Sequence, residues 1–208
     1  MNRSSNLTLK TNTMKIILMI ALGLFLLFAG SQAWTYFSTE NTEQQAYNVI
    51  EQEGNIEIRL YPSATLASVS KKGKMGDISS DGFRTLAGYI FGGNEDQKSI
   101  PMTAPVRMVE NSDSTVMSFV MPSKEAKEGL PQPNSTRITM EQTETVYAAT
   151  LRFGGFMRSA DLKSKKAELL SWLDKKGINY HLPIEYLSYN PPYQTVGRRN
   201  EIYVRIDY

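Results

Sequence analysis

The part of this chain expected to fold contains one pattern that occurs twice at a nearly constant offset. In each half, two short β-like runs end at a glycine, a helix signal follows, and an alternating strand closes the half. The first copy begins at Ile56 and the second at Ile138, 82 residues later, and the closing strands are Val116–Met121 and Ile202–Ile206. A duplicated unit of this kind builds one sheet with a shared groove, which favours ligand binding over a catalytic cluster.

A proline-bearing segment follows each predicted helix and is expected to lead into the next strand. These segments are Thr103–Pro105 in the first half and Tyr189–Pro192 in the second. With the hairpin signal at Gly54-Asn55, the chain has about eight or nine strands and two helices. Hairpin connections dominate, so we predict an α+β fold: a curved, mostly antiparallel sheet forming an open, distorted barrel, with both helices on one side.

The two helices are predicted from apolar spacing and from end signals. Ser80 or Asp81 suits the start of the first helix, and Gly92–Asn94 suits its end. The second helix is expected from Ser159 to Gly177. The apolar positions are Phe83, Leu86, Ala87 and Ile90 in the first helix, and Leu162, Leu169, Leu170 and Leu173 in the second.

The N-terminus has the composition of an export signal. Three basic residues precede an apolar run from Ile16 to Ala29, and no acidic residue occurs before Glu40. Small residues at Ser31 and Ala33 suit cleavage after Ala33, whereas a run extended to Phe37 is long enough to span a bilayer. Both outcomes stay open. We expect a signal peptide or membrane anchor at 1–37, a tether at 38–46 and the folded domain at 47–208.

Charge and composition limit the location and partners of the domain. The basic flank stays on the cytoplasmic side, so the domain is expected to face outward, which in a bacterium is the periplasm. Three of the 23 basic residues lie in the leader, so 20 basic and 21 acidic residues remain, and a nearly neutral domain argues against nucleic acid. The absence of cysteine excludes disulfides and thiolate metal sites. We expect a monomer.

The residues do not indicate an enzyme. His181 is the only histidine, and it would have to supply all the base chemistry of a hydrolytic site. No group of histidines, cysteines or carboxylates has the spacing of a metal site. Gly92–Asn94 ends a helix, whereas phosphate groups bind at helix starts. We therefore predict no catalytic residue and no metal ligand.

Several segments, taken together, resemble the SOUL family of haem-binding proteins. Ile56–Tyr61 resembles the family's YEIRxY opening, and Ile100–Val106 resembles its MTAPV signature. Phe83–Asn94 is similar to the first helix with its YIxGxN end, and Tyr189–Tyr203 to the closing YNxP…RRNEVW segment. The likeness covers Tyr47 to the C-terminus in the right order, and it indicates a bacterial member with an N-terminal signal or anchor.

The resemblance implies a fold and a ligand. The fold is two repeated units that form a curved sheet with two helices, in agreement with the duplication. The ligand is haem or a related tetrapyrrole, bound non-covalently in an apolar groove, for haem buffering or transfer outside the cytoplasm. The candidate binding residues are Phe83, Leu86, Ala87 and Ile90 as the wall, Tyr89 and Met102 at its edges, and Arg84, Arg198 and Arg199 for the propionates.

This chain departs from the SOUL pattern at the position of the iron ligand. Some members carry an axial histidine directly after the arginine of the opening motif, and Leu60 stands there in this chain. His181 matches no ligand position and is expected in a loop. Binding is therefore expected without histidine ligation. The alternative is a binding module for another hydrophobic or cationic small molecule, as in related effector domains, which would need an acidic centre, for which Glu201 is the best candidate.

Overall fold

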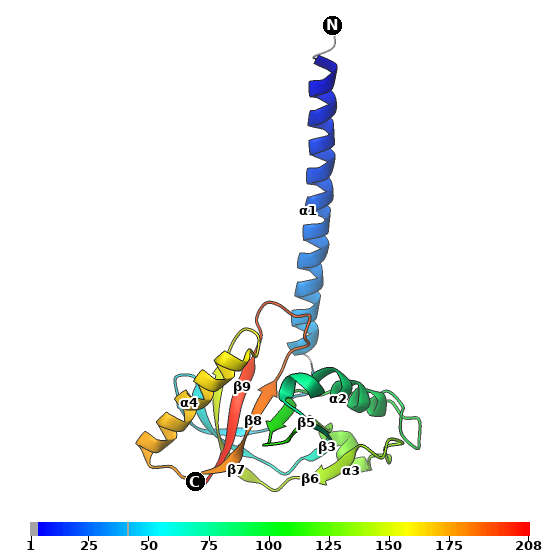
Figure 1. Cartoon of the computed structure of the whole chain (residues 1–208). Helices are drawn as coiled ribbons and strands as arrows, with labels where there is room; N and C mark the ends of the chain where they lie inside the picture. The colour runs from blue at the N-terminus through cyan, green and yellow to red at the C-terminus, as the bar shows by residue number, and fades with distance from the viewer. Residues whose placement is uncertain (1–3, 41) are drawn as a thin grey trace.

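The computed structural model describes residues 4–40 and 42–208, which form four helices and one nine-stranded antiparallel sheet (Figure 1). The sheet has two free edges and does not close, so the predicted α+β fold is confirmed. In chain order the elements are α1 (Ser4–Glu40), β1 (Asn48–Glu53), β2 (Ile56–Tyr61), β3 (Thr65–Lys72), α2 (Met75–Ile90), β4 (Val106–Glu110), β5 (Ser114–Val120), α3 (Ser123–Glu128), β6 (Thr139–Gln142), β7 (Val146–Phe153), α4 (Ser159–Lys176), β8 (Tyr180–Ser188) and β9 (Asn200–Ile206).

The strand order shows the predicted duplication directly. It is β1-β2-β7-β9-β8-β4-β5-β3-β6, so β2-β7-β9-β8 on one side mirror β6-β3-β5-β4 on the other. The two units meet where β4 pairs with β8, from Val106 opposite Ser188 to Val109 opposite Glu185. Each unit lends a strand to the other, because β7 pairs with β2 and β6 pairs with β3. The duplicated units therefore form one continuous sheet.

One predicted strand lead-in is wrong. Tyr189–Pro192 lies after β8, in the connection between β8 and β9, and the strand that follows α4 is β8 itself. The sequence hides β8 because its pairing with β9 is irregular between His181 and Glu185, where Pro183 interrupts the alternation. Proline is tolerated in strands at such irregularities. His181 consequently lies in a strand and not in a loop.

The start of α2 is also corrected, while its end is confirmed. The helix begins at Met75, five residues before Ser80, because Met75 packs against both core clusters and this contact favours helix ahead of the predicted cap. After the helix, Gly92 has a φ of +102°, a conformation that favours glycine. Helix α4 ends, as expected, at Gly177 in the left-handed conformation.

Two apolar clusters lie on the same face of the sheet, one under each long helix of the domain. Leu86 and Ile90 of α2 pack over β3, β4 and β5, and Leu169 and Leu173 of α4 pack over β2, β7 and β9. Tyr186 on β8 borders both clusters. Because side chains alternate along each strand, the opposite face of the sheet is left for a different set of residues.

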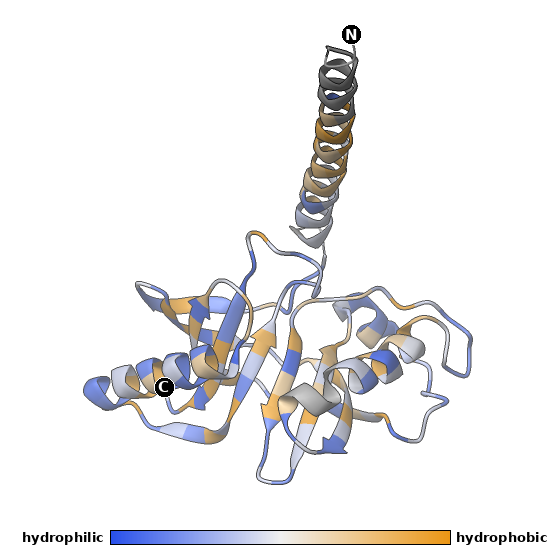
Figure 2. Cartoon of the chain, turned by 45° about the horizontal axis from the view of Figure 1, so that its top comes forward, coloured by the Kyte–Doolittle hydropathy of each residue, from blue (hydrophilic) through white to orange (hydrophobic). Residues whose placement is uncertain are grey.

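Most of the N-terminal helix projects away from the domain (Figures 1 and 2). Among the described residues, Met14–Thr39 of α1 is the one helical stretch long and apolar enough to cross a membrane. Residues 43–47, which we call the strap, return to the domain, although 38–46 was expected as a tether. The backbone N–H of Gln45 donates to Ala104 O at 2.8 Å, and Ala104 N–H donates to Glu43 O at 2.8 Å.

Candidate functional site

The sheet face opposite α2 and α4 carries a buried group of charged and aromatic side chains, centred on Glu201 of β9. Arg59 of β2 donates two hydrogen bonds to this carboxylate, at 2.7 and 3.0 Å. Arg199 donates from Nε and Nη2 to Glu201 Oε1 at 2.9 and 2.7 Å, and the Tyr189 hydroxyl donates to Oε2 at 3.0 Å. We call these four residues the Glu201 network.

The strap is held over this network by its side chains. Arg199 donates to Gln44 Oε1 and to the Tyr47 hydroxyl oxygen, both at 3.0 Å. The Arg59 guanidinium lies 4.1 Å from the centre of the Tyr47 ring, a cation–π contact. Beside the network, Arg107 donates to Gln45 Oε1 at 3.0 Å. The strap therefore closes this face of the sheet.

The charges inside the network are balanced by contact. Burial by itself raises the pKa of Glu201, but the hydrogen bonds and charges of Arg59 and Arg199 outweigh it and hold this pKa below its ordinary value. Burial raises the pKa of Tyr61 and Tyr189, so both hydroxyls stay protonated; that of Tyr189 donates to Glu201, and that of Tyr61 accepts from Arg59. Both Glu201 oxygens already accept hydrogen bonds from guanidinium groups, so an organic cation would have to displace an arginine to reach this carboxylate.

Four of the predicted binding residues face the core and not solvent. Leu86, Tyr89 and Ile90 are fully buried between α2 and the sheet, and Met102 is half-buried against the same cluster. The Tyr89 hydroxyl donates to Pro131 O at 2.9 Å, so its oxygen is committed to the interior. These side chains hold α2 in place.

The other three residues predicted on α2 lie toward solvent. Arg84 is exposed and Ala87 is half-buried, whereas Phe83 is 36 % exposed and packs edge-to-face against the buried Phe119 ring of β5, with 5.3 Å between the ring centres. Phe91, which is 71 % exposed, continues the same face because its N–H still donates to Ala87 O, as in a further helical turn. We call Phe83, Arg84, Ala87, Gly88 and Phe91 the outer face of α2. The i, i+4, i+8 spacing of Phe91 could have shown its place in the sequence, but the Gly92–Asn94 stop signal obscured it.

The structure does not bring Arg198 and Arg199 to α2. Arg199 belongs to the Glu201 network, on the opposite face of the sheet. Arg198 donates to the carbonyl oxygens of Gly155, Pro191 and Gln194, at 3.2, 2.7 and 2.8 Å. The Arg198 guanidinium therefore organises the connection between β8 and β9, whereas that of Arg199 holds Glu201 and the strap.

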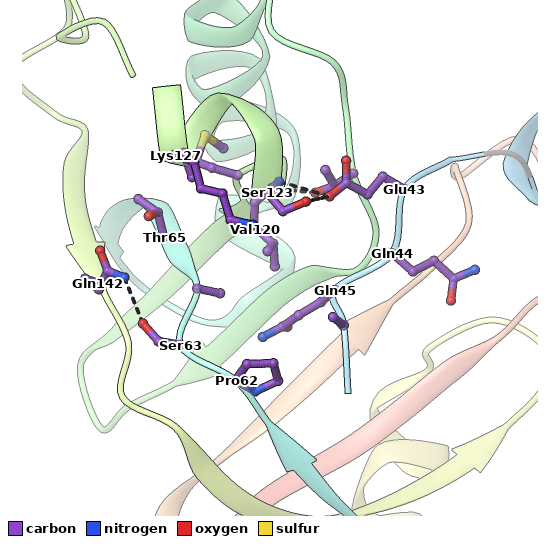
Figure 3. A pocket seen from close by; sticks show the side chains of 15 residues that line it. Glu43, Gln44, Gln45, Pro62, Ser63, Thr65, Val120, Ser123, Lys127 and Gln142 are labelled. Atoms are coloured by element: carbon purple, nitrogen blue, oxygen red, sulfur yellow. Dashed lines mark hydrogen bonds between the residues drawn. The ribbon is translucent and has the colours of Figure 1, made fainter. Parts of the chain in front are cut away.

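A hollow of about 220 Å³ lies between the strap and α3 (Figure 3). The Glu43 carboxylate accepts hydrogen bonds from Ser123 N–H at 2.9 Å and from its hydroxyl at 2.8 Å, and Gln142 donates to Ser63 at 2.8 Å. Ligand pockets for small molecules usually enclose about 300–1,000 Å³, so this hollow is too small for a tetrapyrrole. None of the nine predicted binding residues lines it.

A second, more open hollow of about 700 Å³ lies at the end of the sheet where the chain terminates. Its polar wall includes Arg205 and His181, whose Nε2 is hydrogen-bonded to Asp207 Oδ1 at 2.6 Å. Tyr147 and Tyr208 line it as well. Within the described residues, no group of three or more histidine, aspartate or glutamate side chains is placed to hold a metal ion.

Comparison with known proteins decides the family. The sequence model of "SOUL heme-binding protein" matches residues 42–205. This chain belongs to the SOUL heme-binding protein family. "Heme-binding protein 1" of Xenopus laevis is 30 % identical over 175 residues, which cover 79 % of this chain and 90 % of that protein. "Heme-binding protein 2" of Homo sapiens is 29 % identical over 162 residues, covering 74 % and 78 %.

Solved structures similar to this SOUL chain support its fold alone. The C-terminal domain of EcmrR superposes with a TM-score of 0.53 at 12 % identity, covering 77 % of this chain and 98 % of that one. A structure described as a hydrolase from Listeria innocua has a TM-score of 0.54 at 9 % identity, covering 76 % and 94 %. At these identities the common feature is the duplicated sheet, and no function is transferred.

Residues of the SOUL motifs make structural contacts in this chain. Arg59 and Tyr61 of the opening motif meet Glu201 of the closing motif in one buried contact. Asn94, at the end of the first-helix motif, is buried and bonds the backbone of Tyr89 and Lys98. Leu60, at the position of the axial histidine, lies half-buried opposite Tyr147.

Proposed function

We propose that this SOUL domain binds haem or a related tetrapyrrole non-covalently on the outer face of α2. The observation that carries the proposal is the outer face of α2, where Phe83 is partly exposed and Phe91 is largely exposed, in a chain whose family and relatives are named for haem binding. A helix rises 1.5 Å per residue, so the backbone positions of Phe83 and Phe91 are about 12 Å apart along the axis. A planar macrocycle fits against such a spacing.

The residues between the two rings suit this ligand. A side chain added at Gly88 would meet nothing within 4 Å, so the backbone there is open to close approach. Arg84 beside it supplies a cation of the kind that pairs with propionate carboxylates. The Tyr89 hydroxyl is bound to Pro131, so the protein holds the group by apolar contact and charge and not by a tyrosine ligand. When bound, haem would supply an iron centre to the site.

The proposed location of the domain rests on the composition of α1. The apolar stretch of α1 is compatible with a signal peptide or a membrane anchor. We propose that the helix is retained as an anchor, that the domain faces outward, and that it buffers or transfers haem outside the cytoplasm. The strap attaches the domain directly to the end of this helix, so ligand exchange would take place close to the membrane.

A haemin titration of the full chain in detergent, followed by absorbance, tests the binding proposal. We expect a saturable one-to-one change in the Soret band. Burying one phenylalanine side chain is worth about 1.5–3 kcal/mol, and each 1.4 kcal/mol is tenfold in affinity. The Phe83→Ala, Phe91→Ala double variant is therefore expected to bind about 100-fold or more weakly.

Two control variants test the competing hollow at the chain terminus. His181→Ala and Tyr208→Ala remove side chains that line it, and both residues are exposed, so neither change should unfold the domain. We expect both controls to bind haemin like the unmodified chain. Loss of binding in the controls, with full binding in the α2 double variant, would place the ligand at that hollow and refute the α2 site.

A further inference from the structure

The last turns of α1 are packed against the connection between β8 and β9. Gln32 Oε1 accepts two hydrogen bonds from Thr195, from its N–H and from its hydroxyl, both at 2.9 Å. One residue before the helix ends, the Thr39 hydroxyl donates to Gln194 Oε1 at 3.1 Å. These contacts join residues more than 150 positions apart in the chain. The connection therefore stays at the level of the helix end.

Side-chain packing reinforces these hydrogen bonds. The Tyr36 ring lies so close to Gly197 that an added side chain there would meet ring carbons at 3.0 and 3.2 Å. Thr35 is buried, although its neighbours Trp34 and Tyr36 in the helix are exposed. Arg198 extends the contact to the loop between β7 and α4, where its guanidinium lies 4.7 Å from the centre of the Phe156 ring.

Helix geometry sets the depth of this contact in a membrane. A hydrocarbon core of about 30 Å takes about 20 helical residues at 1.5 Å each. Counted from Ile16, which follows the charged Lys15, such a span ends near Thr35. Gln32 then lies at the outer edge of the hydrocarbon, and Thr195, which is hydrogen-bonded to it, must lie at nearly the same depth. A retained anchor thus forces this connection into the headgroup region.

The exposed side chains at this level suit that region. Tyr193 and Val196 of the connection are 68 % and 69 % exposed, although both are large and apolar or aromatic. Trp34 on the helix and Phe156 on the neighbouring loop are exposed as well. In Figure 1 the connection between β8 and β9 rises on the side of the domain from which α1 leaves. Tryptophan and tyrosine are enriched where proteins cross the membrane–water boundary.

We infer that the β8–β9 connection is a second membrane contact, which inserts Tyr193 and Val196 among the lipid headgroups beside the anchor. The proposed partner is the outer surface of the same bilayer that α1 spans. The inference rests on retention of α1 and is independent of haem binding. Its consequence is a fixed orientation: the domain sits against the membrane with β9 starting at the lipid surface, and it does not swing on a flexible tether.

The chain contains no cysteine, so single labels can be placed at will. The full chain is reconstituted in phosphatidylcholine–phosphatidylglycerol vesicles with a nitroxide label at Val196→Cys, and its accessibility to oxygen and to a water-soluble nickel chelate is measured. The references are Leu24→Cys, inside the apolar span, and Asp113→Cys, in the hairpin at the far ends of β4 and β5.

The expected result is a depth for Val196 near the headgroups, with nickel accessibility several-fold lower than at Asp113. Equal accessibility at Val196 and Asp113, with Leu24 inside the bilayer, would refute the membrane contact. Loss of the Leu24 label from the mature protein would show cleavage of the leader and would also refute it. Haemin titration of the same vesicles tests haem binding independently of the membrane contact, because the label at Val196 lies away from α2.

Discussion

At the residue scale, the stability of this domain depends on a carboxylate that water does not reach. Glu201 is 0 % exposed, and its charge is matched by Arg59 and Arg199, which come from β2 and from the segment before β9. Taking such charges out of water is costly unless each is paired and hydrogen-bonded. Arg199 also holds Tyr47 and Gln44 of the strap, so loss of the ion pairs would also release the strap from the sheet.

Removing one partner from this network should be strongly destabilising. We expect Arg59→Met to lower the free energy of unfolding by about 3–5 kcal/mol, because it leaves a buried carboxylate with half of its guanidinium contacts. Urea unfolding followed by tryptophan fluorescence measures the change. Arg152→Met, an exposed arginine on the neighbouring strand β7, is the matched control and should stay within about 0.5 kcal/mol. Equal stability of the two variants would contradict a stabilising network.

The same carboxylate predicts an acid-sensitive fold. The pKa of Glu201 lies below its ordinary value of 4.5 in the folded state, so its contribution is fully present above that value and is lost as pH falls through the folded pKa. We expect unfolding free energies measured by urea at stepped pH to decline below about pH 4.5. Glu201→Gln should be less stable at pH 7 and show a shallower decline. If the free energy of unfolding declined equally steeply below pH 4.5 in both proteins, the acid sensitivity would come from groups other than Glu201.

Two neighbouring glycines should respond oppositely to alanine. A side chain at Gly93 would stand 2.5 Å from the backbone oxygen of Gly88, a contact that the chain can relieve only by moving the end of α2. At Gly88 itself the space is open, and replacing a helical glycine by alanine is worth about 0.5–1 kcal/mol. We expect thermal unfolding to show a lower midpoint for Gly93→Ala and a higher one for Gly88→Ala. The same sign for both would contradict this account of the turn.

At the element scale, the two faces of α2 have different roles: the inner face packs in the core, and the outer face is the proposed binding surface. Its inner face lies in the core, and its outer face meets solvent. Leu86→Ala should cost about 2–5 kcal/mol of unfolding free energy, because it leaves a cavity in a fully buried position. Phe91→Ala should change stability by less than about 0.5 kcal/mol, since its ring is exposed. Urea unfolding of both variants checks the division, and a large loss of stability in Phe91→Ala would refute it.

At the scale of the whole molecule, the strap belongs to the folded domain, so the domain begins before its first strand, β1. A chain that begins at residue 42 keeps the Gln45–Ala104 backbone pairing, the Arg107–Gln45 bond and the Tyr47 contacts. A chain that begins at residue 48 loses all of them and exposes buried arginines. We expect the shorter chain to be less stable by about 2 kcal/mol or more, since each buried polar group left without a partner costs about 1–3 kcal/mol. Equal thermal midpoints would show that the strap contributes nothing.

Local periodicity was enough to predict much of this molecule. The repeat, the strands with clear alternation, the apolar leader and the extent of α4 follow from spacing that depends only on neighbouring residues. The same reasoning failed at β8, where a proline and an irregular register break the alternation, and at the start of α2, where packing of Met75 outweighs the cap signal. Local signals lose to tertiary contacts where the two disagree.

Which residues face solvent was decided by the tertiary structure. Arg59 and Glu57 alternate with isoleucines, a pattern that predicts a solvent-exposed side of the strand. Arg59 is nevertheless buried, because β9 brings Glu201 to it from 142 residues away and the strap covers both residues. The apolar positions of α2 divide likewise: Leu86 and Ile90 face the sheet, while Phe83 and Ala87 belong to the outer face. Alternation in a sequence records that a strand has two sides, and only the packed chain determines what covers each one.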